Sequence, residues 1–184
     1  HTVQTKNKGA LQLSTSNNAL RLLASNFNHI EPSTLQWLDG IAHADDILFD
    51  IGASTGCFSV YAAVDNPGKT FAFEPDILNF SQIPVQHQAN VTRINHLEYF
   101  NIALGNSTSR QHLEIKNASA GAHCKLIKSP EDDTAPKGIN AFSQPTLMMT
   151  LDDAIEVFGL PSPTHLKIDV DGFEYFVLEG ARKT

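Results

Sequence analysis

Two apolar runs, each ending in an acidic residue, constrain the fold of this chain more than any other feature. Residues 47–52 contain Asp50 and lead into the glycine turn Gly52-Ala-Ser-Thr-Gly56, and residues 69–74 end in Glu74. Each run is typical of a buried strand, and a helix is predicted between them over residues 57–64. Glycines let a backbone pass close to a ligand, and an acid at the end of the next strand can accept hydrogen bonds from a ribose. The pattern predicts a nucleoside-binding edge in an α/β fold.

The rest of the chain continues this alternation of strands and helices, which favours a mainly parallel sheet with helices on both faces. After a turn at 105–109, a hairpin strand is predicted to return on the preceding one, and the loop-like excursion 117–145 is expected to select the substrate. We expect an N-terminal helical segment at 1–44 and a cofactor-binding domain at 45–184. The remaining predicted strands are 96–104, 110–116, 146–149 and 165–172, and the remaining predicted helices are 10–26, 32–41, one from Asp76 that Pro84 should end or kink, 151–158 and 173–182.

Charge and composition exclude several classes of protein. The formal net charge is −7, which argues against a nucleic-acid-binding surface, because that would need a basic face. No apolar run is long enough to span a bilayer, and no signal-peptide pattern opens the chain, so no membrane partner is expected. The two cysteines give no disulfide framework, which favours a reducing, cytoplasmic location.

The glycine turn indicates which ligand to expect. Ser54 stands where a dinucleotide-binding turn has its second glycine, and Asp50 would repel a pyrophosphate. A ligand with a cationic group suits Asp50 better, and S-adenosylmethionine has an ammonium, a sulfonium and free ribose hydroxyls. The alternative for Asp50 is a structural helix cap. A nicotinamide-dependent oxidoreductase and a non-catalytic cofactor-binding module remain the competing functions.

The strand at 165–172 carries charges at alternate positions. Lys167, Asp169 and Asp171 should share one face of a regular strand, and three charges in a central strand are costly unless they are paired or lie at a site. Asp169 is the candidate catalytic base, and Lys167 is a second candidate if burial lowers its pKa. A structural ion pair is the alternative for Lys167. We predict no metal, although the two aspartates could hold Mg²⁺.

These segments together resemble the FkbM family of S-adenosylmethionine-dependent methyltransferases, over roughly residues 46–181. The matching segments are Phe49-Asp-Ile-Gly-Ala-Ser-Thr-Gly-Cys-Phe-Ser59, Ala72-Phe-Glu-Pro75, Asn101-Ile-Ala-Leu-Gly105, Thr150-Leu-Asp-Asp153, Leu166-Lys-Ile-Asp-Val-Asp-Gly-Phe-Glu174 and Val177-Leu-Glu-Gly180. The resemblance implies a class I methyltransferase sheet of Rossmann-like form and, commonly, transfer to a hydroxyl.

The resemblance also implies a role for each site residue. The residues implied to bind S-adenosylmethionine are Asp50, Gly52, Ala53 and Gly56 at the methionine part, Glu74 at the ribose, Asn101 and Ala103 at the adenine, and Asp169 beside the reacting centre. Asp171 stands where the family more often has Glu, and Ser54-Thr55 replaces a more usual Asn-x pair. A complete sheet of this class has three more strands, so the chain looks truncated after the fourth core strand. We expect O-methylation of a small molecule or saccharide, and the oligomeric state stays open.

Overall fold

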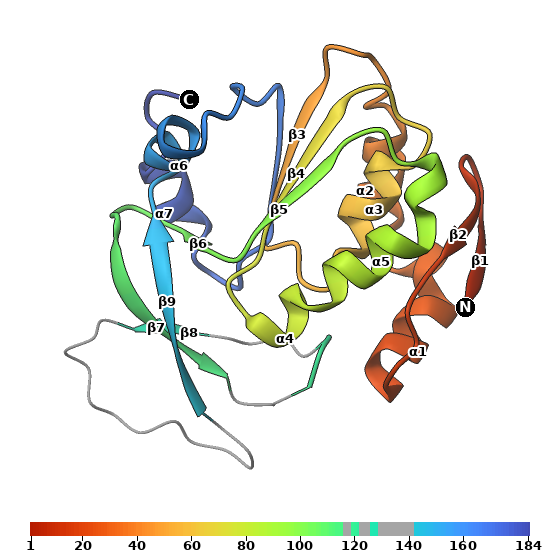
Figure 1. Ribbon diagram of the computed structural model, residues 1–184, viewed down its shortest axis with the longest axis horizontal. Coiled ribbons are helices and arrows are strands. Elements are labelled where there is room, and N and C mark those ends of the chain that lie inside the picture. Colours follow the sequence, from red (N-terminus) through yellow and green to blue (C-terminus); the bar gives the residue numbers. More distant parts are fainter. Residues whose placement is uncertain (116–118, 122–125, 129–141) are drawn as a thin grey trace.

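The computed structural model describes residues 1–115, 119–121, 126–128 and 142–184. Its centre is a parallel sheet of four strands in the order β10-β3-β4-β5 (Figure 1). The bounds of these strands are β3 Ile47–Ile51, β4 Lys69–Phe73, β5 Leu97–Phe100 and β10 His165–Ile168. The predicted parallel sheet is confirmed, although its last strand ends four residues earlier than expected (172 − 168 = 4).

The order of the strands marks a crevice. The chain passes from β3 to β4 to β5 in one direction and then returns to add β10 on the other side of β3. In open α/β sheets, ligands bind beyond the carboxyl ends of the strands at the point where the order reverses. That point lies here between β3 and β10, so the topology itself predicts a site at the end of these two strands.

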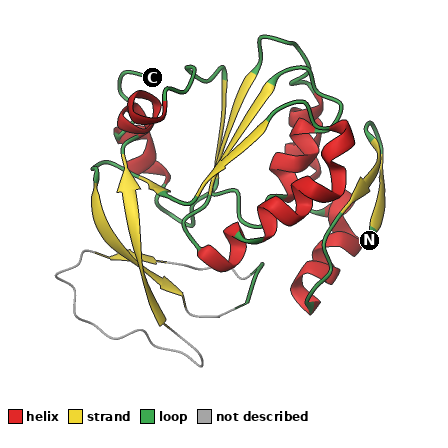
Figure 2. Ribbon diagram, in the orientation of Figure 1, coloured by secondary structure: helices red, strands yellow, loops and turns green. Residues whose placement is uncertain are grey.

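Helices cover both faces of this sheet (Figure 2), as predicted. Alternate side chains of each strand point to opposite faces. Leu48 and Ala72 belong to the hydrophobic cluster that also contains residues of four helices, whereas Phe49 and Phe73 belong to a second cluster with two helices. The first cluster involves α1 Asn18–Asn26, α2 Pro32–Asp39, α3 Cys57–Ala63 and α5 Gln82–Asn90; the second involves α6 Leu151–Phe158 and α7 Glu174–Glu179.

The N-terminus differs from its prediction. A hairpin of β1 (Thr2–Thr5) and β2 (Gly9–Gln12) precedes α1, so the helix predicted from residue 10 is wrong over its first part. The strands form because exposed and buried side chains alternate in β1. The side chain of Asn17 accepts a hydrogen bond from the Leu20 backbone and starts α1 there. A short 3₁₀ turn, Phe27–His29, then leads to α2.

The helix expected from Asp76 is two helices. The first, α4, covers Ile77–Phe80, and α5 begins at Gln82. Pro84 lies in the first turn of α5 and lacks the N–H that would bond to the Phe80 carbonyl, and α4 ends at Phe80, so the helix is interrupted as predicted, although four residues before the proline. A second 3₁₀ turn, Val91–Arg93, follows α5.

The structure contains a second sheet of four strands that the sequence did not predict. Its order is β6-β9-β7-β8, with β7 antiparallel to both β9 and β8. The predicted strand 96–104 breaks after Phe100, and its end pairs with β9 instead of continuing in the parallel sheet. The predicted hairpin partner of that strand, β7, pairs with β9 as well. Most of the 117–145 excursion lies outside the described residues. The bounds are β6 Ala103–Leu104, β7 Ser109–Ile115, β8 Leu126–Lys128 and β9 Phe142–Met149.

In the described part of the chain, no helix has the length and apolar character needed to cross a membrane.

Candidate active site

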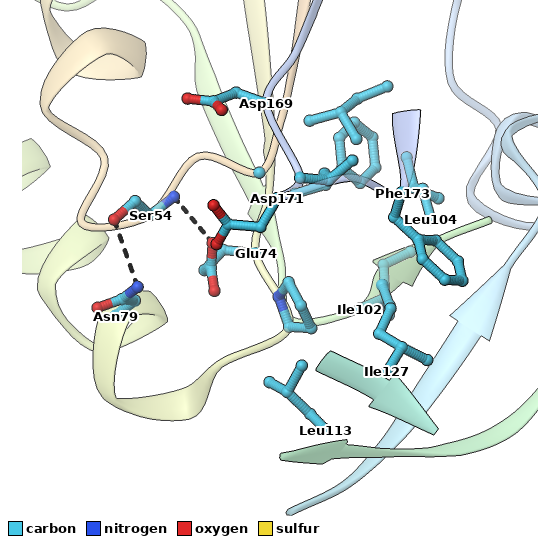
Figure 3. Close-up of a pocket in the computed structure, with 16 residues that line it drawn as sticks. Ser54, Glu74, Asn79, Ile102, Leu104, Leu113, Ile127, Asp169, Asp171 and Phe173 are labelled. Carbon is cyan, nitrogen blue, oxygen red and sulfur yellow. Dashed lines mark hydrogen bonds between the residues drawn. The ribbon is translucent and has the colours of Figure 1, made fainter. Parts of the chain in front are cut away.

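A cavity opens at the reversal point of the strand order, and we call it the first cavity (Figure 3). It has a volume of about 100 Å³. Its floor comes from the ends of β3 and β4, and β6, β7, β8 and the chain after β10 form its walls. The residues that line it are Ile51, Gly52, Ser54, Phe73, Glu74, Pro75, Asn79, Ile102, Ala103, Leu104, Leu113, Ile127, Asp169, Val170, Asp171 and Phe173.

Glu74 lines this cavity and lies directly after β4. Its side chain is only 5% exposed. One carboxylate oxygen accepts a hydrogen bond of 2.8 Å from the Ser54 backbone N–H, and the other accepts one of 2.9 Å from the Asp76 N–H. The carboxylate therefore fixes the glycine turn to the end of β4 and also faces the cavity (Figure 3).

The glycine turn is shaped first by the protein's own backbone. The N–H groups of Gly52 and Ala53 both donate to the Phe73 carbonyl. Gly52 has φ +80°, and a Cβ there would lie 1.9 Å from the Asp169 backbone oxygen. Gly56 has φ +81°, and a Cβ there would press against Ile83 of α5 at 3.0 Å. Packing against the neighbouring elements thus requires both glycines, and the role at the cofactor expected for them stays a prediction.

Asp50 is buried completely and lines neither of the two cavities described here. It accepts a hydrogen bond of 2.5 Å from the Ser59 hydroxyl and one of 3.0 Å from the Lys167 ammonium. The carboxylate lies on the α3 face of the sheet, inside an ion pair. Its contacts place it beneath the turn, where it positions Lys167 and α3.

Lys167 carries its positive charge in this ion pair. Burial alone would lower its pKa, but the attraction of Asp50, their hydrogen bond and the nearby carboxylates of Asp169 and Glu31 raise the pKa of Lys167 above its ordinary value. The sequence analysis makes Lys167 a candidate base only if burial lowers its pKa. Because the pKa of Lys167 is raised, this condition is not met. Its ammonium also lies 5.6 Å from the centre of the Phe58 ring.

Among the described residues, Asp169 is the charged side chain that lines both cavities. Its carboxylate lies 3.8 Å from the Lys167 ammonium and is 59% exposed. It lines the first cavity and also a second cavity of about 490 Å³. Gly52 and Ser54 line both cavities as well. The cavities are therefore neighbours that share one rim.

Asp171 does not follow the regular alternation predicted for it. The strand ends at Ile168, and Asp171 has φ +52°, which turns the chain back toward the first cavity. Glu174 accepts hydrogen bonds from the Val170 and Gly172 N–H groups. Hydrogen bonds from its own backbone N–H, the largest cause, and from those of Gly172 and Val170 lower the pKa of Glu174. Within the described residues, no group of three or more His, Cys, Asp or Glu side chains could hold a metal ion.

The two residues expected at the adenine have different places. The Asn101 side chain donates to the Glu74 and Pro75 carbonyls, at 2.8 and 3.0 Å, and lines neither cavity. It ties the end of β5 to the end of β4. Ala103 lines the first cavity, between Ile102 and Leu104.

The second cavity lies between the glycine turn and the N-terminal helices. Its far wall comes from α1 and from the chain that leads to α2. Ala53, Thr55, Phe58 and Lys167 belong to its near wall. The residues of the far wall are Ala19, Leu22, Leu23, Asn26, Phe27, Ile30 and Glu31.

Sequence reasoning missed several residues of both cavities. Asn79 is buried and holds the first cavity together, because its amide donates to the Ser54 hydroxyl and accepts from the Gly121 N–H. Ser59, which donates to Asp50, lines neither cavity, and its signal was its place inside the segment that resembles the family. The α1 side chains gave no signal, because an apolar helix face is more often core.

Backbone strain gathers around these cavities. Among described non-glycine residues, positive φ occurs at Glu31, Ser54, Asp65 and Asp171, and all but Asp65 line one of the two cavities. Such conformations cost free energy and are found preferentially at functional sites.

Comparison with known proteins identifies the family of this chain. The family model described as "Methyltransferase FkbM domain" matches residues 50–184. No curated protein matches the chain. Two solved structures from Pyrococcus horikoshii are partly similar. TYW2 in complex with MeSAdo has 21% identity and a TM-score of 0.34 over 39% of this chain, and PH0793 has 18% identity and a TM-score of 0.34 over 42% of this chain.

The chain spans only 26% of the TYW2 chain and 34% of the PH0793 chain. The assignment rests on the family model, which covers most of the sequence and both acidic strand ends. The resemblance expected from the sequence is thereby confirmed: this chain belongs to the FkbM methyltransferase family.

Proposed function

We propose that this chain binds S-adenosylmethionine at the first cavity and transfers its methyl group to a hydroxyl of a small molecule or saccharide. The observation that carries the proposal is the place of Glu74. Its carboxylate follows β4 and faces the cavity, where it can accept hydrogen bonds from a ribose, and Ser54 stands in the glycine turn where a pyrophosphate needs a second glycine. This arrangement favours a sulfonium nucleoside over a nicotinamide dinucleotide.

The residues present fit such a ligand. Glu74 is placed to accept hydrogen bonds from ribose hydroxyls, and apolar side chains beside it suit the flat face of an adenine. The apolar set is Ile102, Ala103, Leu104, Leu113, Ile127 and Phe173. Asp169 and the glycine turn, where both cavities meet, are the place for the amino-acid end and the sulfonium. A ligand of this length extends past the first cavity to that rim.

When bound, S-adenosylmethionine supplies an electrophilic methyl group that an acceptor oxygen can take up. The chain must then orient the acceptor and remove its proton. Asp169 is the residue for both tasks, because its carboxylate is exposed at the rim and can accept the proton of a hydroxyl. Lys167 remains charged and holds Asp169 and Asp50 in place.

Calorimetric titration with S-adenosylhomocysteine, the demethylated product, tests the donor site. We expect the wild-type chain to bind it, and Glu74→Gln to weaken binding about tenfold, because hydrogen bonds to a charged acceptor are lost. Glu156→Gln is the matched control, since Glu156 is exposed on α6 and lines neither cavity. Binding of NADH without S-adenosylhomocysteine would instead favour an oxidoreductase.

The base is tested separately by turnover. With methyl-labelled S-adenosylmethionine and a set of alcohols as acceptors, Asp169→Asn should lower methyl transfer about 100-fold while S-adenosylhomocysteine binding changes far less. Unchanged transfer by this variant would remove Asp169 from the role. Binding with no transfer to any acceptor would support a non-catalytic module.

A further inference from the structure

The side chains that line the second cavity differ from those that line the first. Its far wall is apolar, with Leu22, Leu23, Phe27 and Ile30, and Phe58 lies opposite on α3. At about 490 Å³, it is large enough to enclose a small organic molecule. It shares its rim with the donor cavity, so a molecule in it lies next to Asp169.

Polar side chains in this cavity are concentrated at one end. Lys167 and Asp169 lie 3.8 Å apart there, and Glu31 is close enough to act on the charge of Lys167. Elsewhere, polar lining groups are engaged within the protein. The Asn26 amide donates to the Leu22 carbonyl, and the Thr55 hydroxyl contacts the Cys57 sulfur. A sugar, with hydroxyls on all sides, would leave most of them against apolar side chains, which is costly.

The charge at the polar end is unfavourable for anions. The Lys167 ammonium lies 3.0 Å from Asp50 and 3.8 Å from Asp169, so this one described cation faces the carboxylates of Asp50, Asp169 and Glu31. A carboxylate or phosphate on the acceptor would be repelled, whereas a neutral hydroxyl can donate to Asp169.

We propose that the second cavity is the acceptor site and that the acceptor is an uncharged, mostly apolar alcohol or phenol, whose body lies against α1 and whose hydroxyl lies at Asp169. The proposal deepens the function proposed above and rests on the first cavity being the donor site. It selects the small-molecule acceptor over the saccharide. The far wall comes from residues 19–31, which precede the family match at 50–184, so the specificity would belong to this chain and not to the family motif.

The test uses 2-naphthol, which is neutral at pH 7, as the probe. Its binding to the 184-residue chain is measured by saturation-transfer NMR with S-adenosylhomocysteine at saturation, beside 2-naphthoate and methyl glucoside. We expect 2-naphthol to bind, 2-naphthoate to bind at least about tenfold more weakly because of the two carboxylates, and methyl glucoside to give no signal.

Substitutions in the far wall of the second cavity test whether 2-naphthol binds there. Leu22→Gln should weaken 2-naphthol binding about fivefold, because apolar contact is lost, and should leave S-adenosylhomocysteine affinity unchanged. Leu22 is 66% exposed, so the chain should still fold. Leu23→Gln should act in the same direction, and if it unfolds the chain, Leu22→Gln decides alone. Leu178→Gln is the matched control: it changes the same residue type on a helix, is 56% exposed and lines neither cavity.

Each other outcome overturns the inference in a recognisable way. Tighter binding of 2-naphthoate or methyl glucoside contradicts the substrate class. Loss of S-adenosylhomocysteine affinity in Leu22→Gln, with competition between it and 2-naphthol, assigns the cavity to the amino-acid end of the cofactor. If the wild-type chain binds 2-naphthol in a Leu22-dependent way but never binds S-adenosylhomocysteine, the proposed function fails while the apolar site stands.

Discussion

The two cavities share a rim but are held by different means. Turns and strand ends shape the first: Gly52 and Ser54 have left-handed backbone, and Glu74 fixes the turn through two backbone N–H groups. The second is a gap between α1 and the glycine turn, lined by the side chains of Leu22 and Leu23. The difference teaches that backbone conformation fixes the first cavity, whereas side chains of α1 shape the far wall of the second cavity.

The largest effect should come from the ion pair beneath the shared rim. Lys167→Met leaves Asp50 buried without a counter-charge, and such a change costs about 3–5 kcal/mol of unfolding free energy. Urea denaturation measures it, with Lys69→Met, at an exposed position, as the control. The double variant with Asp50→Asn should recover part of the loss. Equal stability of Lys167→Met and Lys69→Met would show that the pair does not support the rim.

Gly52→Ala should damage both cavities at once. The added Cβ would collide with the Asp169 carbonyl and must also adopt a left-handed conformation, so we expect a loss of about 2–4 kcal/mol and no S-adenosylhomocysteine binding. Gly159→Ala is the control, because Gly159 has φ +63° with nothing near its Cβ position, and should cost about 1 kcal/mol. Similar losses in both variants would leave only backbone strain as the cause.

One variant tests whether the two cavities can be affected separately. Asn79→Ala removes the amide that joins Ser54 to Gly121 and should weaken S-adenosylhomocysteine binding about fivefold, since the turn loses a support worth about 1 kcal/mol. The same variant should weaken 2-naphthol binding less, because Ser54 and Gly121 line the second cavity but Asn79 does not. Parallel losses for both ligands, measured by calorimetry and NMR, would mean that the cavities behave as one site.

A further effect is expected at Lys8, which lines neither cavity. Burial, opposed by Asp39 and Asp65, lowers the pKa of Lys8 to about 8 from 10.5. Below pH 8 both folded and unfolded chains hold the proton, and between pH 8 and 10.5 only the unfolded chain does. Stability from this residue should therefore rise with pH across that window. Lys8→Met should lack the rise in urea titrations, and a fall in the wild type relative to the variant would contradict it.

The parallel half of the molecule was predictable because its signals are local. Residues 47–51 and 69–73 are apolar runs that fit strands buried on both faces, and α6 has a Thr150 cap and a Gly159 end that bound it at the predicted residues. The antiparallel sheet was not predictable, because β6 pairs with β9, which lies more than 35 residues later. No short-range pattern specifies such a partner.

The sequence by itself determined the chemistry available at the strand ends: two acids, a glycine turn and an Asp169 that follows the fourth parallel strand. The tertiary structure decided how that chemistry is used. It buried Asp50 against Lys167, kept Glu74 at a cavity and brought α1 across from the turn to enclose a second space. The physical reason is that charge pairing and burial depend on contacts between residues far apart in the chain, whereas strand and turn preferences depend on neighbours.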